Sequence, residues 1–197
     1  MLAYWMRYCG GKMARIVKTH IFEGPTEEAV IKALGLHGRN FKFNLNQNFI
    51  KTKVSTLSSG ELYLFLDMDE ISQLKAKNKG KIAPCLEMLE KNVSFLAKSR
   101  SYKKIYIVLQ YYNLEDEIAY ASGKTKAQLL KSLSVSSEGE LKTKINKSQN
   151  LLKMLEDVGF DSSKFWHRNV CEEHRAMVKR FLSSPKVKLV TLSDIIV

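Results

Sequence analysis

The sequence contains little cysteine, and its cysteines are not spaced for cross-linking or for binding zinc. Three occur among 197 residues, as Cys9, Cys85 and Cys171. An odd number of widely separated cysteines argues against a disulfide framework and against a zinc knuckle. Disulfides are rare in reducing compartments, so we expect a cytoplasmic protein.

Long hydrophobic runs are also missing. Apolar stretches such as Leu62–Leu66 have the length of a strand, whereas a membrane-spanning helix needs about 20 apolar residues. The apolar residues 1–6 are too few and too aromatic for a signal peptide, and Met13 is an alternative to Met1 as the native start. We therefore expect no association with a membrane.

Acidic residues are in the minority, with 20 against 32 basic residues and a net charge of +12. The few acids are concentrated. Residues 61–120 carry nine acidic and nine basic side chains, whereas each flanking segment has a basic excess of six. A basic body attracts the phosphates of DNA or RNA, and gathered carboxylates suit a metal site. A solvated lysine-rich surface would give the same totals.

Hydrophobic periodicity predicts strands alternating with helices. The runs 62–66 and 105–109 are apolar on both faces, which is typical of strands covered on two sides. The order predicts an α/β fold over residues 13–118, with a mainly parallel central sheet and helices on both faces. A mainly helical extension over 119–197 could return a last strand to the sheet. We expect further strands at 16–22, 41–48, 49–57 and 187–190, and helices at 25–34 and 85–98.

Acidic side chains follow three of the predicted strands. Glu23 follows the first, Asp67 and Asp69 follow the run 62–66, and Glu115 follows a later run. Because ligands of parallel sheets gather at the carboxyl ends of the strands, we expect these groups to meet. Carboxylates suit hard cations such as Mg²⁺ or Mn²⁺. Capping of the next helix is the alternative role for the aspartates.

A second glutamate, Glu27, lies four residues after Glu23. The turn between them contains Gly24 and Pro25, and proline is tolerated in the first turn of a helix. Both carboxylates can therefore point into one crevice. Compensation of the helix dipole is the alternative role for Glu27, and it is the role we expect for Glu28.

Two of these motifs, in this order, resemble those of a known family. Glu23-Gly24-Pro25-Thr26-Glu27 resembles the first motif of the topoisomerase–primase (TOPRIM) family, and Asp67-Met68-Asp69 resembles its second. The resemblance covers about residues 15–112. The second glutamate makes the chain most similar to the overcoming-lysogenization-defect nucleases and related small bacterial phage-defence proteins. Where topoisomerases and primases have a glycine, this chain has Glu70-Ile71-Ser72.

The resemblance implies metal-dependent hydrolysis of nucleic-acid phosphodiester bonds, in a phage-defence setting, with Mg²⁺ or Mn²⁺ as cofactor. It implies that Asp67 and Asp69 are shared metal ligands and that Glu23 is a ligand or general base. It also implies outer ligands, which would be Glu27 and Glu115, with Asp116 or Glu117 competing for the place of Glu115. A catalytic lysine is expected, for which the candidates are Lys124 and Lys164.

A lysine-rich segment is the candidate nucleic-acid contact. We expect it to be a mobile loop whose side chains hold the phosphate backbone or merely remain solvated. Its members are Lys75, Lys77, Lys79 and Lys81.

Two other functions stay open. The chain could be a non-catalytic module that binds nucleic acid or a separate ATPase protein, or a small TOPRIM nuclease of RNA maturation. Enzymes of the leading family often work with an ATPase, and no ATPase motif occurs in this sequence. A homodimer is a further possibility, because residues 138–158 could form a dimer element.

Overall fold

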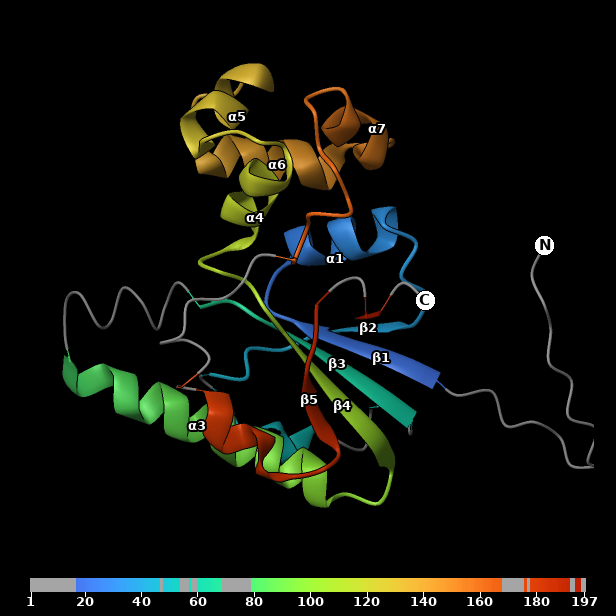
Figure 1. Ribbon diagram of the computed structural model, residues 1–197, viewed down its shortest axis with the longest axis vertical. Coiled ribbons are helices and arrows are strands. Elements are labelled where there is room, and N and C mark those ends of the chain that lie inside the picture. The colour runs from blue at the N-terminus through green and yellow to red at the C-terminus, as the bar shows by residue number, and fades with distance from the viewer. Residues whose placement is uncertain are drawn as a thin grey trace, which may run out of the picture.

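A computed structural model describes residues 17–46, 48–53, 57, 60–68, 79–167, 176, 178–191 and 194–195. Its centre is a five-stranded sheet in the order β2-β1-β3-β4-β5 (Figure 1). Every pairing is parallel, which confirms the predicted sheet. The strands are β1 (Val17–Phe22), β2 (Arg39–Lys42), β3 (Gly60–Leu66), β4 (Tyr102–Leu109) and β5 (Val187–Leu189).

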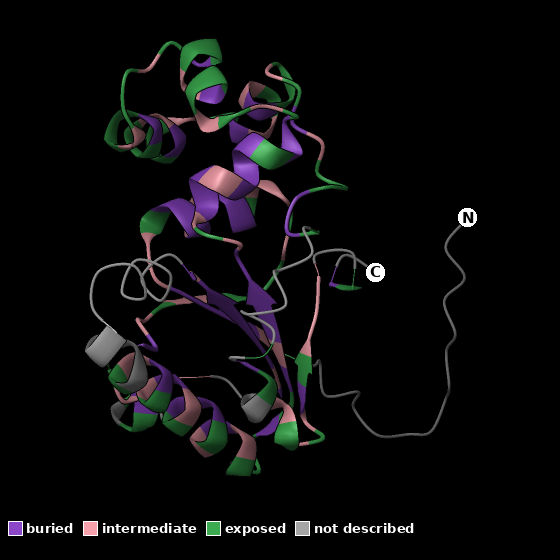
Figure 2. Ribbon diagram, turned by 60° about the vertical axis from the view of Figure 1, so that its left-hand side comes forward, coloured by how far each residue is buried: buried purple, intermediate pink, exposed green. Residues whose placement is uncertain are grey.

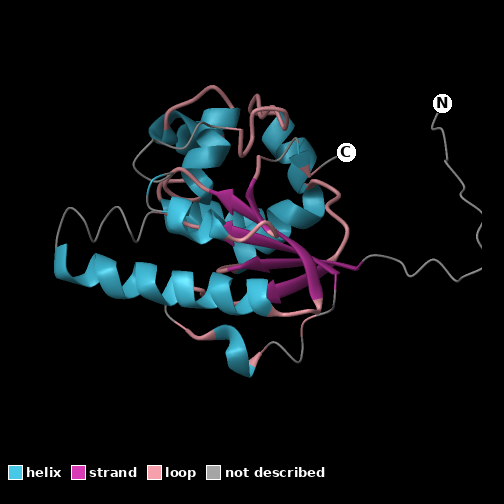
Figure 3. Cartoon of the chain, turned by 60° about the horizontal axis from the view of Figure 1, so that its bottom comes forward, coloured by secondary structure: helices cyan, strands magenta, loops and turns pink. Residues whose placement is uncertain are grey.

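Helices cover both faces of this sheet, as predicted (Figures 1 and 3). One face carries α3 (Lys79–Lys98) and the 3₁₀ turn η3 (Arg180–Ser183). The helices of the other face are α1 (Pro25–Ala33), α4 (Leu114–Ala121), α5 (Lys126–Ser132), α6 (Glu138–Lys147) and α7 (Leu151–Glu156).

The central strand β3 shows why the sheet is covered on two sides. Its side chains alternate between two buried clusters: Leu62 and Leu64 pack on the face of α3, and Tyr63 and Phe65 pack on the face of α1. Successive residues of a strand point to opposite faces. A run that is apolar at every position therefore requires a partner layer on each side.

The helices after β4 do not form a core of their own. Leu141 of α6 and Leu155 of α7 belong to the same buried cluster as Val30 of α1 and Phe65 of β3. Figure 2 shows buried residues continuing from the strands into the inner sides of these helices. The helical region is thus one layer of the same core.

Three local expectations were wrong. Within 49–57, Ile50–Thr52 forms the 3₁₀ turn η1 and not a strand. The strand expected at 41–48 is the short edge strand β2, which ends at Lys42. The helix expected from Cys85 begins at Lys79, so Lys79 and Lys81 belong to a helix and not to a loop. The other two lysines, Lys75 and Lys77, lie outside the described residues.

Within the ranges given above, no helix combines the length and the apolar character needed to cross a membrane.

Candidate functional site at the carboxyl edge of the sheet

The carboxyl ends of β1, β3 and β4 lie side by side, because these strands are parallel neighbours. Glu23 directly follows β1, Asp67 follows β3, and Glu115 lies in the first turn of α4, after β4. The backbone N–H of Met68 donates to the carbonyl of Tyr112 at 3.1 Å, so the segments after β3 and β4 are in contact. We call Glu23, Asp67 and Glu115, together with Glu27, the carboxylate edge.

Two asparagine side chains hold the carboxylate of Glu23. Nδ2 of Asn44 donates to Oε2 at 3.2 Å, and Nδ2 of Asn46 donates to Oε1 at 3.3 Å. Both asparagines come from the loop after β2, and the backbone N–H of Asn46 donates to Oδ1 of Asn44 at 2.9 Å. Neutral amides orient the carboxylate without neutralising its charge. We had not predicted them, because both lie inside the strand expected at 41–48, where they would only form its polar face.

Asn92 of α3 anchors the loop that carries these two asparagines. The side chain of Asn92 is fully buried. Nδ2 of Asn92 donates to the carbonyls of Leu45 and Asn48, each at 2.7 Å. Its Oδ1 accepts the N–H of Ile50 at 2.8 Å. One side chain thus satisfies three backbone groups, and it fixes the loop from which Glu23 receives its hydrogen bonds.

Glu115 is almost completely buried, with 1% of its surface exposed. Burial raises the pKa of its carboxyl, because a charged group loses its hydration in the interior. The ammonium of Lys142 on α6 lies 3.6 Å from Oε1 and opposes this shift. The negative charges of Glu27 and Glu138 add to the rise in pKa. The carboxylates of Glu27 and Glu115 are therefore near enough to repel each other, as Glu115 and Glu138 also are.

Glu27 is also buried, and its carboxylate folds back against the turn before α1. A Cβ atom added at Gly24 would lie 2.6 Å from Oε2 of Glu27. This is closer than real Cβ contacts. The glycine of the Glu-Gly-Pro-Thr-Glu motif therefore leaves space for the second glutamate of the same motif.

The two competitors of Glu115 have contacts elsewhere. Asp116 forms an ion pair with Lys126 at 2.9 Å, and Oε1 of Glu117 accepts the backbone N–H of Tyr111 at 2.7 Å. These contacts tie α4 to α5 and to the end of β4. Of the three acidic residues, Glu115 is the one we retain in the site.

The structure brings a lysine to the carboxylate edge that sequence reasoning did not select. Lys142 pairs with Glu115, whereas Lys164 pairs with Asp161 at 3.2 Å, and the ammonium of Lys124 lies beside Gly159. In the sequence Lys142 is one of several lysines in an amphipathic helix. Only its ion pair with Glu115 in the folded chain distinguishes it.

The donor chemistry of the edge suits a hard cation. Its groups are carboxylate and amide oxygens, which Mg²⁺ and Mn²⁺ prefer. Two of these oxygens, Oδ1 of Asn46 and Oε1 of Glu115, are buried and accept no hydrogen bond from the described chain. Among the residues that the structure describes, no three acidic, histidine or cysteine side chains converge for metal binding. Asp69, the second aspartate of the motif, lies outside those residues.

These features define an α/β protein with a Rossmann-like parallel sheet and acidic groups at the carboxyl ends of its central strands. No protein-family model matches the chain, and neither does any curated protein or any solved structure.

Proposed function

We propose that this protein is a divalent-metal-dependent nuclease that hydrolyses phosphodiester bonds of DNA or RNA. One observation carries the proposal: Glu23, Asp67 and Glu115 follow three neighbouring parallel strands, at the edge where such sheets bind their ligands. The order and spacing of these acids resemble the TOPRIM motifs, and the net charge of +12 suits a polyanionic substrate.

The acidic side chains of the site would have different roles, which follow from their surroundings. Asp67 and Asp69 would hold the cation, with Glu27 and Glu115 as outer ligands. Bound Mg²⁺ or Mn²⁺ supplies positive charge for the phosphate and lowers the pKa of a water molecule. Glu23, fixed through both oxygens by Asn44 and Asn46, is positioned to accept a proton from the attacking water.

Lys142 is the lysine that we assign to this site. Its side chain is about half exposed at 52%, while its partner Glu115 is buried. The ammonium can thus reach solvent at the edge of the sheet while it offsets the charge of the buried carboxylate. A positive charge in this place favours an approaching phosphate and stabilises the charge that develops during its hydrolysis.

The test is cleavage of plasmid DNA and of labelled RNA, with Mg²⁺ or Mn²⁺, by the purified protein and by Asp67→Asn plus Asp69→Asn. We expect activity to fall by about a hundredfold or more, the scale of loss when one preorganised charge-stabilising group is removed. Asp157→Asn directly after α7 is the matched control, because Asp157 is exposed and is not one of the residues assigned to the edge. Undiminished cleavage by the double variant would contradict the proposal.

A non-catalytic nucleic-acid-binding or ATPase-binding module is the second candidate. The observation in its favour is that no three metal-binding side chains converge within the described ranges. Metal-independent binding without cleavage under any condition would support this function. Cleavage that appears only when a partner ATPase is added would instead indicate a nuclease held in check.

A further inference from the structure

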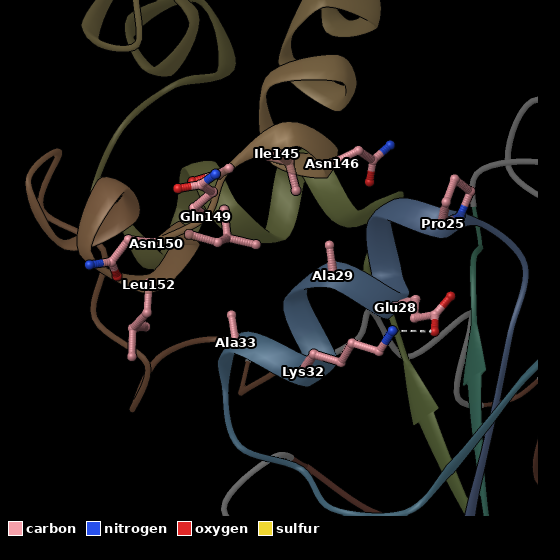
Figure 4. A pocket seen from close by; sticks show the side chains of 12 residues that line it. Pro25, Glu28, Ala29, Lys32, Ala33, Ile145, Asn146, Gln149, Asn150 and Leu152 are labelled. Atoms are coloured by element: carbon pink, nitrogen blue, oxygen red, sulfur yellow. Dashed lines mark ion pairs between the residues drawn. The ribbon is translucent and has the colours of Figure 1, made fainter.

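A groove with a volume of about 730 Å³ separates α1 from the end of α6 and the start of α7 (Figure 4). This volume is within the range of small-molecule pockets. One wall comes from α1, between Pro25 and Ala33, and the other from residues 145–152.

Apolar and polar side chains line the groove in similar proportion. Ala29 and Ala33 point from α1 toward the opposite wall, and Ile145 points back toward them (Figure 4). The two charged lining residues, Glu28 and Lys32, pair with each other at 2.7 Å. A ligand that combines apolar surface with uncharged hydrogen-bonding groups would suit this groove, and it needs no charge of its own.

Amide side chains supply the polar rim. Gln149 and Asn150 are exposed, and neither side chain is hydrogen-bonded to any described part of the protein. Asn150 occupies the N-cap of α7 without making a capping bond. A carboxamide presents a donor beside an acceptor, which matches the edge of a nucleobase, as in the pairing of asparagine or glutamine with adenine.

The groove also adjoins the carboxylate edge. Pro25 at its end is two residues from Glu23. Nδ2 of Asn146 donates to Oγ1 of Thr26 at 3.4 Å, which joins the rim to the first turn of α1. Lys142, which pairs with Glu115, is on the same helix α6 as Asn146. A strand whose phosphate lies at the edge can thus continue into the groove.

We propose that this groove binds an unpaired nucleobase of the substrate strand. The substrate is then single-stranded nucleic acid, or a strand with an unpaired base beside the cleaved phosphodiester, because a base inside a duplex cannot enter. The base packs against Ala29, Ala33 and the neighbouring aliphatic side chains, and Gln149 and Asn150 bond to its edge. This inference rests on the proposed nuclease function and names the substrate of the same site.

The experiment measures binding in EDTA, so that it does not depend on cleavage. Fluorescence anisotropy compares a labelled single-stranded oligonucleotide, an abasic strand of the same length, and a duplex. We expect the intact strand to bind about tenfold more tightly than the abasic strand, because the abasic strand has no base to bury in the groove. Gln149→Ala plus Asn150→Ala should reduce this difference, because the hydrogen bonds to the base are lost while the apolar contacts remain, and should leave binding of the abasic strand unchanged.

The control variant is Thr143→Ala, an exposed position of α6 outside the groove, which should keep the full difference. The inference would be overturned if the wild type bound intact and abasic strands equally well. It would also be overturned if the double variant bound the intact strand as tightly as the wild type does. The absence of any binding would overturn it too. Base-dependent binding without cleavage in Mg²⁺ or Mn²⁺ would refute the nuclease proposal and leave the groove assignment standing.

Discussion

Among single residues, Glu115 is the acidic group whose protonation is most clearly linked to folding. Burial raises the pKa of its carboxyl above the ordinary value of 4.5, so the folded protein holds this proton more readily than the unfolded chain. The stabilisation is complete at pH values below the ordinary pKa, and it is lost as the pH rises through the raised pKa. Above that pH, folding buries a charge.

We therefore predict that Glu115→Gln gains stability relative to wild type as the pH increases, since glutamine stays neutral at every pH. Urea unfolding at intervals between about pH 4 and pH 8 measures this difference. Glu140→Gln is the control with the opposite sign, because hydrogen bonds from Ser136 lower the pKa of Glu140. A stability difference for Glu115→Gln that does not change with pH would refute the assignment of a raised pKa.

Sequence reasoning selected the acids of the proposed site but not their neighbours. Glu23, Asp67 and Glu115 could be selected because each follows an apolar run, and the ends of parallel strands meet. Asn44, Asn46 and Lys142 carry no such mark. Their roles depend on how the loop after β2 and the helix α6 pack against the edge, and local periodicity does not encode that packing.

Among the elements, α3 both covers the sheet and supports the site. Apolar residues at helical spacing predicted its carboxyl-terminal part, whereas its beginning at Lys79 was missed because the lysine-rich sequence there resembles a loop. Asn92 in the middle of an apolar face had no explanation from periodicity. The structure shows that its side chain satisfies backbone groups of Leu45, Asn48 and Ile50, next to the turn at Ile50–Thr52.

We predict that Asn92→Leu lowers the free energy of unfolding by about 2–6 kcal/mol, because buried backbone groups at Leu45 and Ile50 lose their partners and each costs about 1–3 kcal/mol. The partly buried carbonyl of Asn48 loses its partner as well. Ser94→Ala, at an exposed position of the same helix, should change stability by less than about 0.5 kcal/mol.

Urea unfolding measures both variants, and hydrogen exchange at the amide of Ile50 should become faster in Asn92→Leu. If the loop is held mainly by other contacts, the two variants will have similar stability. Cleavage should also decrease in Asn92→Leu at temperatures where the variant is folded, because Asn44 and Asn46 would then orient Glu23 less well.

At the scale of the whole molecule, the class of fold followed from the order of elements and from strands that are apolar on both faces. The sequence did not reveal that the helices after β4 share a core with α1 and the sheet. Their apolar stripes would look the same in an independent bundle. What joins them is contact between distant segments, such as the ring of Trp166 against that of Phe65 in β3, with centroids 4.7 Å apart.

A shared core predicts a single cooperative unfolding transition. Leu141 of α6 is fully buried in this cluster, and Leu141→Ala should destabilise the protein by about 2–5 kcal/mol, the usual range for a buried leucine. The unfolding midpoint followed by far-ultraviolet circular dichroism and the midpoint followed by the fluorescence of Trp166 should both fall by the same amount, because helices and sheet unfold as one unit. A Trp5→Phe background leaves Trp166 as the sole tryptophan. In the same background, Thr143→Ala should leave both unfolding midpoints almost unchanged. Two separate transitions in Leu141→Ala would mean that the helices fold independently of the sheet.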